Sequence, residues 1–174
     1  MTPTNPISLL VGIALLTGVY RAILAEPVKD IVVFDFEMMD SSAAAGVVPV
    51  DQLDMKYLAE STQVAKDFLQ AAGNYKIVDA APAAVDIKKA GDLRNCNGCE
   101  APIASKLGGE LAMTGVVNRI SRTEYEILIK VVDAKTGGPV TVGYTGLRMG
   151  ANYSWPRGAK WLIERRVLTN LASK

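Results

Sequence analysis

The two cysteines are the residues with the clearest chemical potential, and they stand in the turn CNGC, at Cys96 and Cys99. Thiols placed just before a helix feel its partial positive charge, which makes the reactive thiolate more available. A thioredoxin motif, however, follows a strand directly and has an aromatic residue before its first cysteine, whereas Arg94 and Asn95 precede Cys96 here. We therefore favour a structural disulfide between Cys96 and Cys99 and keep thiol–disulfide exchange as an alternative.

A metal contact at this turn is a third interpretation. It would combine two thiolates with oxygen ligands such as Glu100 or Asp92, and nothing else in the sequence indicates such a site. The chain has no histidine, which excludes Ser-His-Asp and Cys-His nucleophile systems and histidine-based zinc or copper sites. We therefore expect a non-enzymatic protein, and we assign it neither a metal ligand nor a cofactor.

Three acidic residues, Asp35, Glu37 and Asp40, cluster toward the end of the segment DIVVFDFEMMD. In open sheets with parallel strands, ligands bind at the carboxyl ends of the strands, so these carboxylates are a candidate rim for a ligand or a cation. Alternating acids are also ordinary on a solvated strand face, and we favour that interpretation.

The last predicted helix carries apolar residues on two sides. Five of them share one side and are expected to pack on the sheet: Trp155, Ala159, Leu162, Ile163 and Val167. Trp161 and Leu168 lie nearly opposite, where they are either covered by the leader and loops or exposed to a partner. The candidate partner surface is therefore Trp155, Trp161 and Leu168.

The elements that position these residues follow from hydrophobic periodicity. The pattern predicts strands over 30–39, 75–78, 111–120, 125–132 and 140–147, and helices over 51–72, 82–90, 102–107 and 155–171. In the first strand, Phe34, Phe36 and Met38 are expected on one face. The order β-α-β-α-α-β-β-β-α predicts an α/β (α+β) domain with a mixed sheet of about five strands and helices packed against it.

The first 25 residues resemble an export signal, with an apolar run at 7–19 and small residues before Glu26. We expect a cleaved signal peptide over 1–25 or, alternatively, an uncleaved anchor, followed by a single domain over 26–174. Without Arg21 the chain keeps 18 basic and 18 acidic residues, and this balance argues against nucleic-acid binding. We predict a periplasmic protein that contacts the membrane only if the N-terminal segment is retained.

Five segments carry a family resemblance: VVFDFE at 32–37, CNGCE at 96–100, LAMTGVVNRIS at 111–121, VVDAKTG at 131–137 and SWPRGAKWL at 154–162. Together they resemble a family of exported bacterial proteins of unknown function. That family is similar in strand order, and in its segment 104–115, to the amino-terminal domain of TolB and to the α/β core of curli-secretion and lipoprotein-cofactor domains. The resemblance implies an envelope module that binds other proteins without catalysis, with the cysteine turn as part of the pattern.

These observations favour an exported accessory module that contacts an envelope protein, through the final helix and the loops around the cysteine turn. The first alternative is a periplasmic thiol–disulfide protein that uses Cys96 and Cys99. The second alternative is a ligand or metal carrier at the rim of Asp35, Glu37 and Asp40.

Overall fold

The sheet is mixed, and its strands follow the spatial order β3-β1-β4-β5-β6, with β2 also paired to β4. The computed structural model describes residues 27–148 and 151–171. The strands in these residues are β1 (Lys29–Val33), β2 (Glu37–Asp40), β3 (Tyr75–Val78), β4 (Leu111–Arg119), β5 (Glu124–Asp133) and β6 (Pro139–Arg148). Strands β1 to β4 pair in parallel, whereas β4, β5 and β6 pair antiparallel. The predicted mixed α+β sheet is confirmed, with six strands instead of about five.

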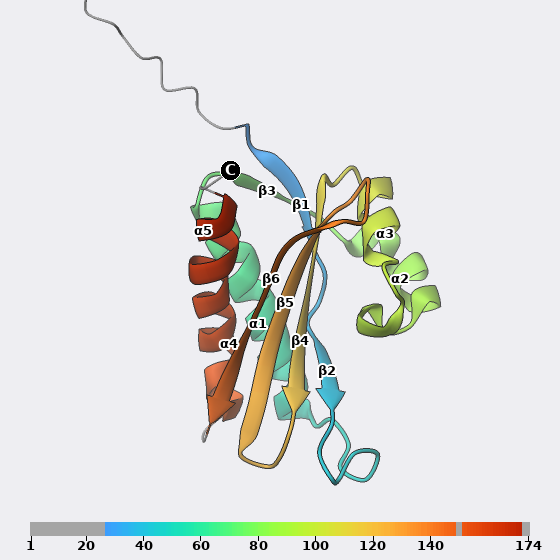
Figure 1. The fold of residues 1–174 in the computed structure, drawn as a ribbon. Helices are drawn as coiled ribbons and strands as arrows, with labels where there is room; N and C mark the ends of the chain where they lie inside the picture. The colour runs from blue at the N-terminus through green and yellow to red at the C-terminus, as the bar shows by residue number, and fades with distance from the viewer. Residues whose placement is uncertain (1–26, 149–150, 172–174) are drawn as a thin grey trace, which may run out of the picture.

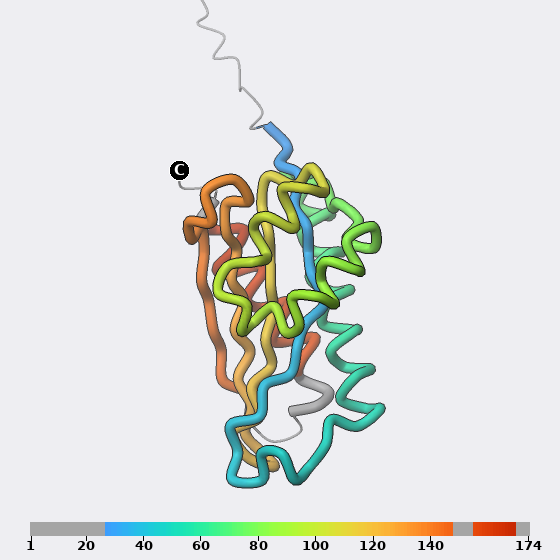
Figure 2. The backbone as a smooth tube through the Cα atoms, turned by 90° about the vertical axis from the view of Figure 1, so that its right-hand side faces the viewer, coloured from blue at the N-terminus to red at the C-terminus, as the bar shows by residue number. Residues whose placement is uncertain are grey.

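Helices lie on both faces of this sheet (Figure 1). They are α1 (Gln52–Ala71), α2 (Ala84–Ala90), α3 (Glu100–Lys106), α4 (Ala151–Leu162) and α5 (Leu168–Leu171). Helices α1 and α4 cover one face (Figure 1), and the core between them and the sheet includes Trp155 and Leu162 of α4 and Ile127 of β5. Helices α2 and α3 cover only part of the opposite face, as the yellow-green segment in Figure 2 shows. The sheet therefore has one sealed face and one that is partly open.

Helix α1 begins and ends where its sequence predicts. The Asp51 carboxylate accepts the Asp54 backbone N–H at 2.8 Å, and the Asp54 carboxylate accepts the Asp51 N–H at 3.3 Å. This reciprocal capping box satisfies two N–H groups that have no partner inside the helix. After α1, Gly73 adopts a φ of 76°, which a glycine reaches without steric cost. The chain then returns as β3, which pairs in parallel with β1.

The first predicted strand is divided into β1 and β2. Between the pairs Val33↔Met113 and Glu37↔Val116, the first strand advances by four residues while β4 advances by three. The Phe36 N–H leaves the ladder and donates to Thr62 Oγ1 of α1 at 2.9 Å. Such an extra residue reverses the facing of the side chains that follow. The prediction that Phe34 shares a face with Phe36 and Met38 is therefore wrong, because Phe34 packs in the opposite core.

The final helix starts earlier than predicted and changes pitch. Helix α4 begins at Ala151, so Pro156 lies inside it and not at its first turn. One turn of π-helix, Ile163–Val167, then joins α4 to α5. The hydrophobic periodicity predicts a start at residue 155, four residues later than the structure shows.

Candidate functional site

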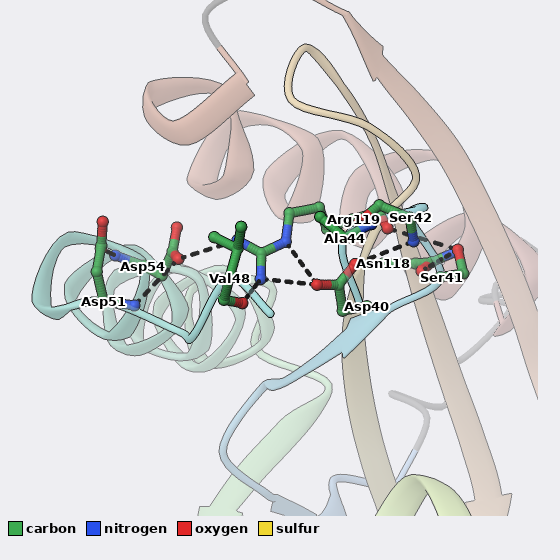
Figure 3. A network of polar contacts seen from close by, with 9 residues as sticks. All are labelled: Asp40, Ser41, Ser42, Ala44, Val48, Asp51, Asp54, Asn118 and Arg119. Atoms are coloured by element: carbon green, nitrogen blue, oxygen red, sulfur yellow. Dashed lines mark hydrogen bonds and ion pairs between the residues drawn. The ribbon is translucent and has the colours of Figure 1, made fainter. Parts of the chain in front are cut away.

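Arg119, the last residue of β4, holds the loop that follows β2 (Figure 3). Its Nε and Nη2 atoms donate to Asp40 Oδ2 at 3.1 and 2.9 Å, and Nη2 also donates to the carbonyl of Val48 at 2.8 Å. Nη1 lies 3.8 Å from Asp54 Oδ2, in the first turn of α1. Arg119 is 7% exposed and Asp54 is 4% exposed, so little water competes with these contacts. One buried guanidinium therefore ties β2, the loop and α1 together.

Smaller polar contacts fix the start of the same loop. The Ser42 N–H donates to Asp40 Oδ1 at 3.0 Å, and Ser41 Oγ donates to Asn118 Oδ1 at 2.9 Å. Hydrogen bonds to Ser42 and the neighbouring Arg119 cation lower the pKa of Asp40 below its ordinary value of 3.8. Asp40 therefore stays ionised, which keeps its ion pair with Arg119 intact at neutral pH.

The loop held in this way, together with the first turn of α1, exposes apolar side chains. Four of them lie within seven residues and are called the loop surface: Val47, Val48, Val50 and Leu53, which are 79, 48, 44 and 45% exposed. Surface loops usually expose polar side chains. A loop that is held by buried hydrogen bonds and yet exposes three valines is therefore unusual. Neither Arg119 nor this surface was predicted from the sequence, although the run GVVPV stands out within a segment otherwise rich in turn residues.

A pocket of about 680 Å³ lies beside the loop surface, between the loop and the β4–β5 turn. Ser42, Val48, Arg119, Arg122 and Tyr125 contribute to its lining. Burial, followed by the nearby Asp54 carboxylate, raises the pKa of Tyr125 above its ordinary value of 10.0. Its phenol therefore stays neutral at physiological pH.

The three acidic residues of the predicted rim do not converge. Asp35 is exposed beside α1, whereas the Glu37 carboxylate accepts the N–H groups of Leu93 and Arg94 at 2.6 and 2.9 Å. Asp40 is engaged by Arg119. Within the described residues, no group of three potential metal ligands includes any of the three. The pocket beside the loop surface does lie near the predicted rim. Glu37 and Asp40, however, form hydrogen bonds that hold neighbouring loops in place.

Cys96 and Cys99 form a disulfide in the structure. The turn between them uses Asn97 and Gly98, which have positive φ values of 53° and 102°. Both cysteines pack at the edge of the core under α3, and each is partly exposed. The bond therefore connects a short 3-10 turn at Leu93–Asn95 to the start of α3.

The residue after this turn, Glu100, is a buried acid. It is 1% exposed, and its Oε1 atom forms an ion pair with Lys130 Nζ on β5. Its Oε2 atom lies 3.8 Å from Cys96 Sγ. Asp92, the other oxygen ligand considered from sequence, instead pairs with Arg94 at the surface. Within the described residues, Cys96, Cys99 and Glu100 are the group whose ligand atoms all lie within 4.8 Å of one another.

The candidate surface on the final helix is reduced to a single exposed residue. Trp155 is fully buried, and its ring contacts Tyr57 and Tyr125 at centroid distances of 6.1 and 5.3 Å. Its assignment to an exposed surface is therefore wrong, because it lies on the side that packs against the sheet. Leu168 packs against the same core and is partly buried. Trp161 is 44% exposed.

A second set of exposed apolar residues lies on the open part of the sheet. Met39, Leu128, Val142 and Tyr144 are 38, 40, 54 and 71% exposed. They come from β2, β5 and β6.

Over 27–148 and 151–171, none of the helices combines the length and the hydropathy that a membrane span requires.

Solved structures share this fold at low sequence identity. The C-terminal domain of LpoB from Salmonella enterica has a TM-score of 0.52 and 11% identity, over 74% of this chain and 88% of that one. The same domain from Escherichia coli has a TM-score of 0.50 and 13% identity, with the same coverage. Lipoprotein GNA1162 from Neisseria meningitidis follows at 0.48 and 15%, over 71% of this chain and 83% of that one. The LpoB domains show that the predicted architecture is an established one.

Sequence comparison gives the family directly. No curated protein matches the chain. Residues 29–167 match the family model DUF3280, whose description reads "Protein of unknown function (DUF2380)". The match spans β1 through the π-helical turn and includes both the Arg119 network and the cysteine turn. The resemblance to a family of unknown function is thus confirmed, and the chain belongs to the DUF3280 family.

Proposed function

We propose that this protein is an exported, non-enzymatic module of the bacterial envelope that acts by contact with another protein. The predicted leader over 1–25 and the Cys96–Cys99 disulfide support an oxidising compartment outside the cytoplasm. The fold shared with the LpoB C-terminal domain supports the same assignment. The contact site is the loop surface of Val47, Val48, Val50 and Leu53.

The observation that carries this proposal is the buried Arg119 network beneath an exposed apolar loop. Burying a guanidinium and two carboxylates has a large desolvation cost, which hydrogen bonds and mutual attraction offset only when the geometry is good. Here the network fixes the shape of a loop that contributes few apolar side chains to the core. A loop that is already ordered loses less conformational entropy when it binds, so the arrangement favours recognition.

The experiment is site-specific crosslinking in the native envelope, with a photoreactive residue at Met55, next to the loop surface and 63% exposed. The wild-type protein should give a defined crosslinked product. The double variant Val47→Asp and Val50→Asp should lose it, because two charges cannot enter an apolar interface without a desolvation cost.

The matched control is the double variant Val85→Asp and Val142→Asp, since these valines are also 79 and 54% exposed but lie on α2 and β6. It should keep the product, as should Trp161→Glu on the final helix. Loss of the product in the Val85 and Val142 variant alone would assign the contact to α2 or to the open sheet face. Loss in Trp161→Glu alone would assign it to the helix. Either result contradicts the proposed loop surface.

A second candidate function is thiol–disulfide exchange at Cys96 and Cys99. It is favoured by the partial exposure of both cysteines, which lets a partner thiol approach. A measured reduction potential below about −300 mV would identify a structural bond and exclude this candidate.

A further inference from the structure

The buried carboxylate of Glu100 has two oxygens with different environments. Oε1 is occupied by the ammonium group of Lys130, whereas Oε2 faces Cys96 Sγ at 3.8 Å. The Cys99 N–H also donates to Cys96 Sγ at 3.2 Å, and such a contact stabilises a thiolate. When the disulfide is reduced, these groups place two thiols, which lose their protons on binding a metal, beside one carboxylate oxygen.

The spacing fits a tetrahedral zinc ion. With bonds of about 2.3 Å to sulfur and about 2.1 Å to oxygen, zinc holds a sulfur and an oxygen ligand about 3.6 Å apart. The separation between Glu100 Oε2 and Cys96 Sγ is 3.8 Å. Two sulfur ligands of one zinc lie about 3.8 Å apart, a distance that cysteines in a Cys-x-x-Cys turn reach once the bond between them is broken.

The charges also balance. Two thiolates and one carboxylate carry three negative charges, and Zn²⁺ together with the Lys130 ammonium carries three positive charges. A partly buried site with zero net charge avoids the desolvation cost of an uncompensated ion. The pair of soft thiolates with one carboxylate suits zinc better than calcium or magnesium, which prefer oxygen ligands throughout.

We propose that the reduced protein binds one Zn²⁺ through Cys96, Cys99 and Glu100, with water as the fourth ligand. A dithiol reductant breaks the disulfide by thiol–disulfide exchange and is itself oxidised to a disulfide, leaving two protein thiols. Zinc binding then releases the two thiol protons. The turn therefore has two states, a disulfide and a zinc site. This proposal does not depend on the proposed protein contact at the loop surface.

The test titrates the full-length chain with Co²⁺, which occupies zinc sites and gives a sulfur-to-cobalt charge-transfer band. A phosphine first reduces the disulfide, because it leaves no thiol to compete for the metal. The reduced protein should bind one Co²⁺ with this band, and Zn²⁺ should displace it. The oxidised protein should show no band. A reduced wild-type protein without the band would overturn the proposal.

The role of Glu100 is tested separately from that of the cysteines. Glu100→Gln should weaken Zn²⁺ binding at least tenfold, measured by competition with a chromophoric chelator. The control is Glu124→Gln, on the same strand as Lys130 but six residues away, or about 20 Å along β5. It should bind Zn²⁺ as the wild type does.

A fold check keeps this test decisive. Glu100→Gln must retain the far-ultraviolet circular dichroism of the reduced wild type. If it does not, Glu100→Asp serves as the second variant, because it keeps the charge but shortens the side chain, and it should also bind at least tenfold more weakly. Equal affinity in a folded Glu100 variant and in the wild type would show a site of two thiolates only, which contradicts the three-ligand site.

Discussion

Two buried ionic clusters stabilise different parts of this molecule, and their construction differs. Around Arg119, one guanidinium contacts Asp40, Asp54 and the carbonyl of Val48, and the three charged side chains are at most 15% exposed. Around Glu100, a buried acid is paired with Lys130, whose side chain is 38% exposed. The charged side chains of the first cluster are all largely buried, whereas the cation of the second reaches solvent.

This difference in exposure matches the two roles that we infer: the Arg119 cluster holds the loop after β2, and the Glu100 cluster lies beside the cysteine turn that can be oxidised or reduced. The Arg119 cluster connects three chain segments, so it holds the loop surface in one shape (Figure 3). The Glu100 cluster lies beside a disulfide, and Lys130 can adjust to a change in charge next to it. We infer that the first cluster serves recognition and the second permits the change between disulfide and zinc.

The largest effect is expected from Arg119→Leu. The substitution leaves Asp40 and Asp54 without their cation, and breaking such a buried cluster costs about 3–5 kcal/mol of unfolding free energy. Urea unfolding at neutral pH measures it. The control is Arg122→Leu, an exposed arginine three residues on, which should change the free energy by less than about 0.5 kcal/mol. A loss below about 1 kcal/mol for Arg119→Leu would mean that the cluster does not hold the loop.

A smaller effect is expected from Lys130→Met. Methionine keeps the length of the side chain but cannot neutralise Glu100, which stays buried, and we expect a loss of about 2–3 kcal/mol. The comparison is Lys135→Met in the β5–β6 turn, where the lysine is exposed and the loss should be near zero. Equal stability of both variants would show that Glu100 finds another partner or becomes neutral.

The reverse substitution, Glu100→Gln, should cost less than Lys130→Met. It removes the buried charge and leaves Lys130 free to reach water, so we expect a loss of about 1 kcal/mol. Unfolding of the oxidised protein measures this loss without interference from metal binding. If Glu100→Gln is more destabilising than Lys130→Met, the inference that an unpaired Glu100 costs more than an unpaired Lys130 is wrong.

Local sequence patterns predicted the parts of the fold that depend on near neighbours. Helix α1 has its cap and its stop within the sequence, and the predicted strand 125–132 forms, with its alternating residues Tyr125, Ile127 and Ile129 in one core. The break between β1 and β2 was not predictable in this way. It depends on the hydrogen bond from Phe36 to Thr62, which lies 26 positions further along the chain.

The candidate site was predicted less well for the same reason. Arg119 and Asp40 are 79 positions apart, and each alone has the appearance of an ordinary charged strand residue. Trp155 illustrates the opposite case, because helical spacing already placed it on the packing side, and that side is where the structure buries it. The cysteine pair was identified from sequence, but the proximity of Glu100 and Lys130 required the tertiary structure.

The smallest effect, and the one most specific to the Arg119 cluster, is a change in acid stability. Hydrogen bonds from Ser42, with help from Arg119, lower the pKa of Asp40 below 3.8, so its carboxylate stabilises the folded state fully above that pH. The contribution is lost as the pH falls through the lower, folded pKa. Asp40→Asn should therefore be less stable than the wild type at pH 6, and the difference should shrink below about pH 3.8.

Asp133 provides the matched comparison for this pH dependence. Its pKa is also lowered, by hydrogen bonds from Thr136 and Lys135 in the β5–β6 turn, far from the loop surface in the sequence. Asp133→Asn should show the same narrowing of the stability difference under acid, measured by thermal melts between about pH 3 and 6. Only Asp40→Asn should also reduce the envelope crosslink, since it alone releases the loop. A crosslink reduced equally by both variants would trace the loss to general stability and not to the loop.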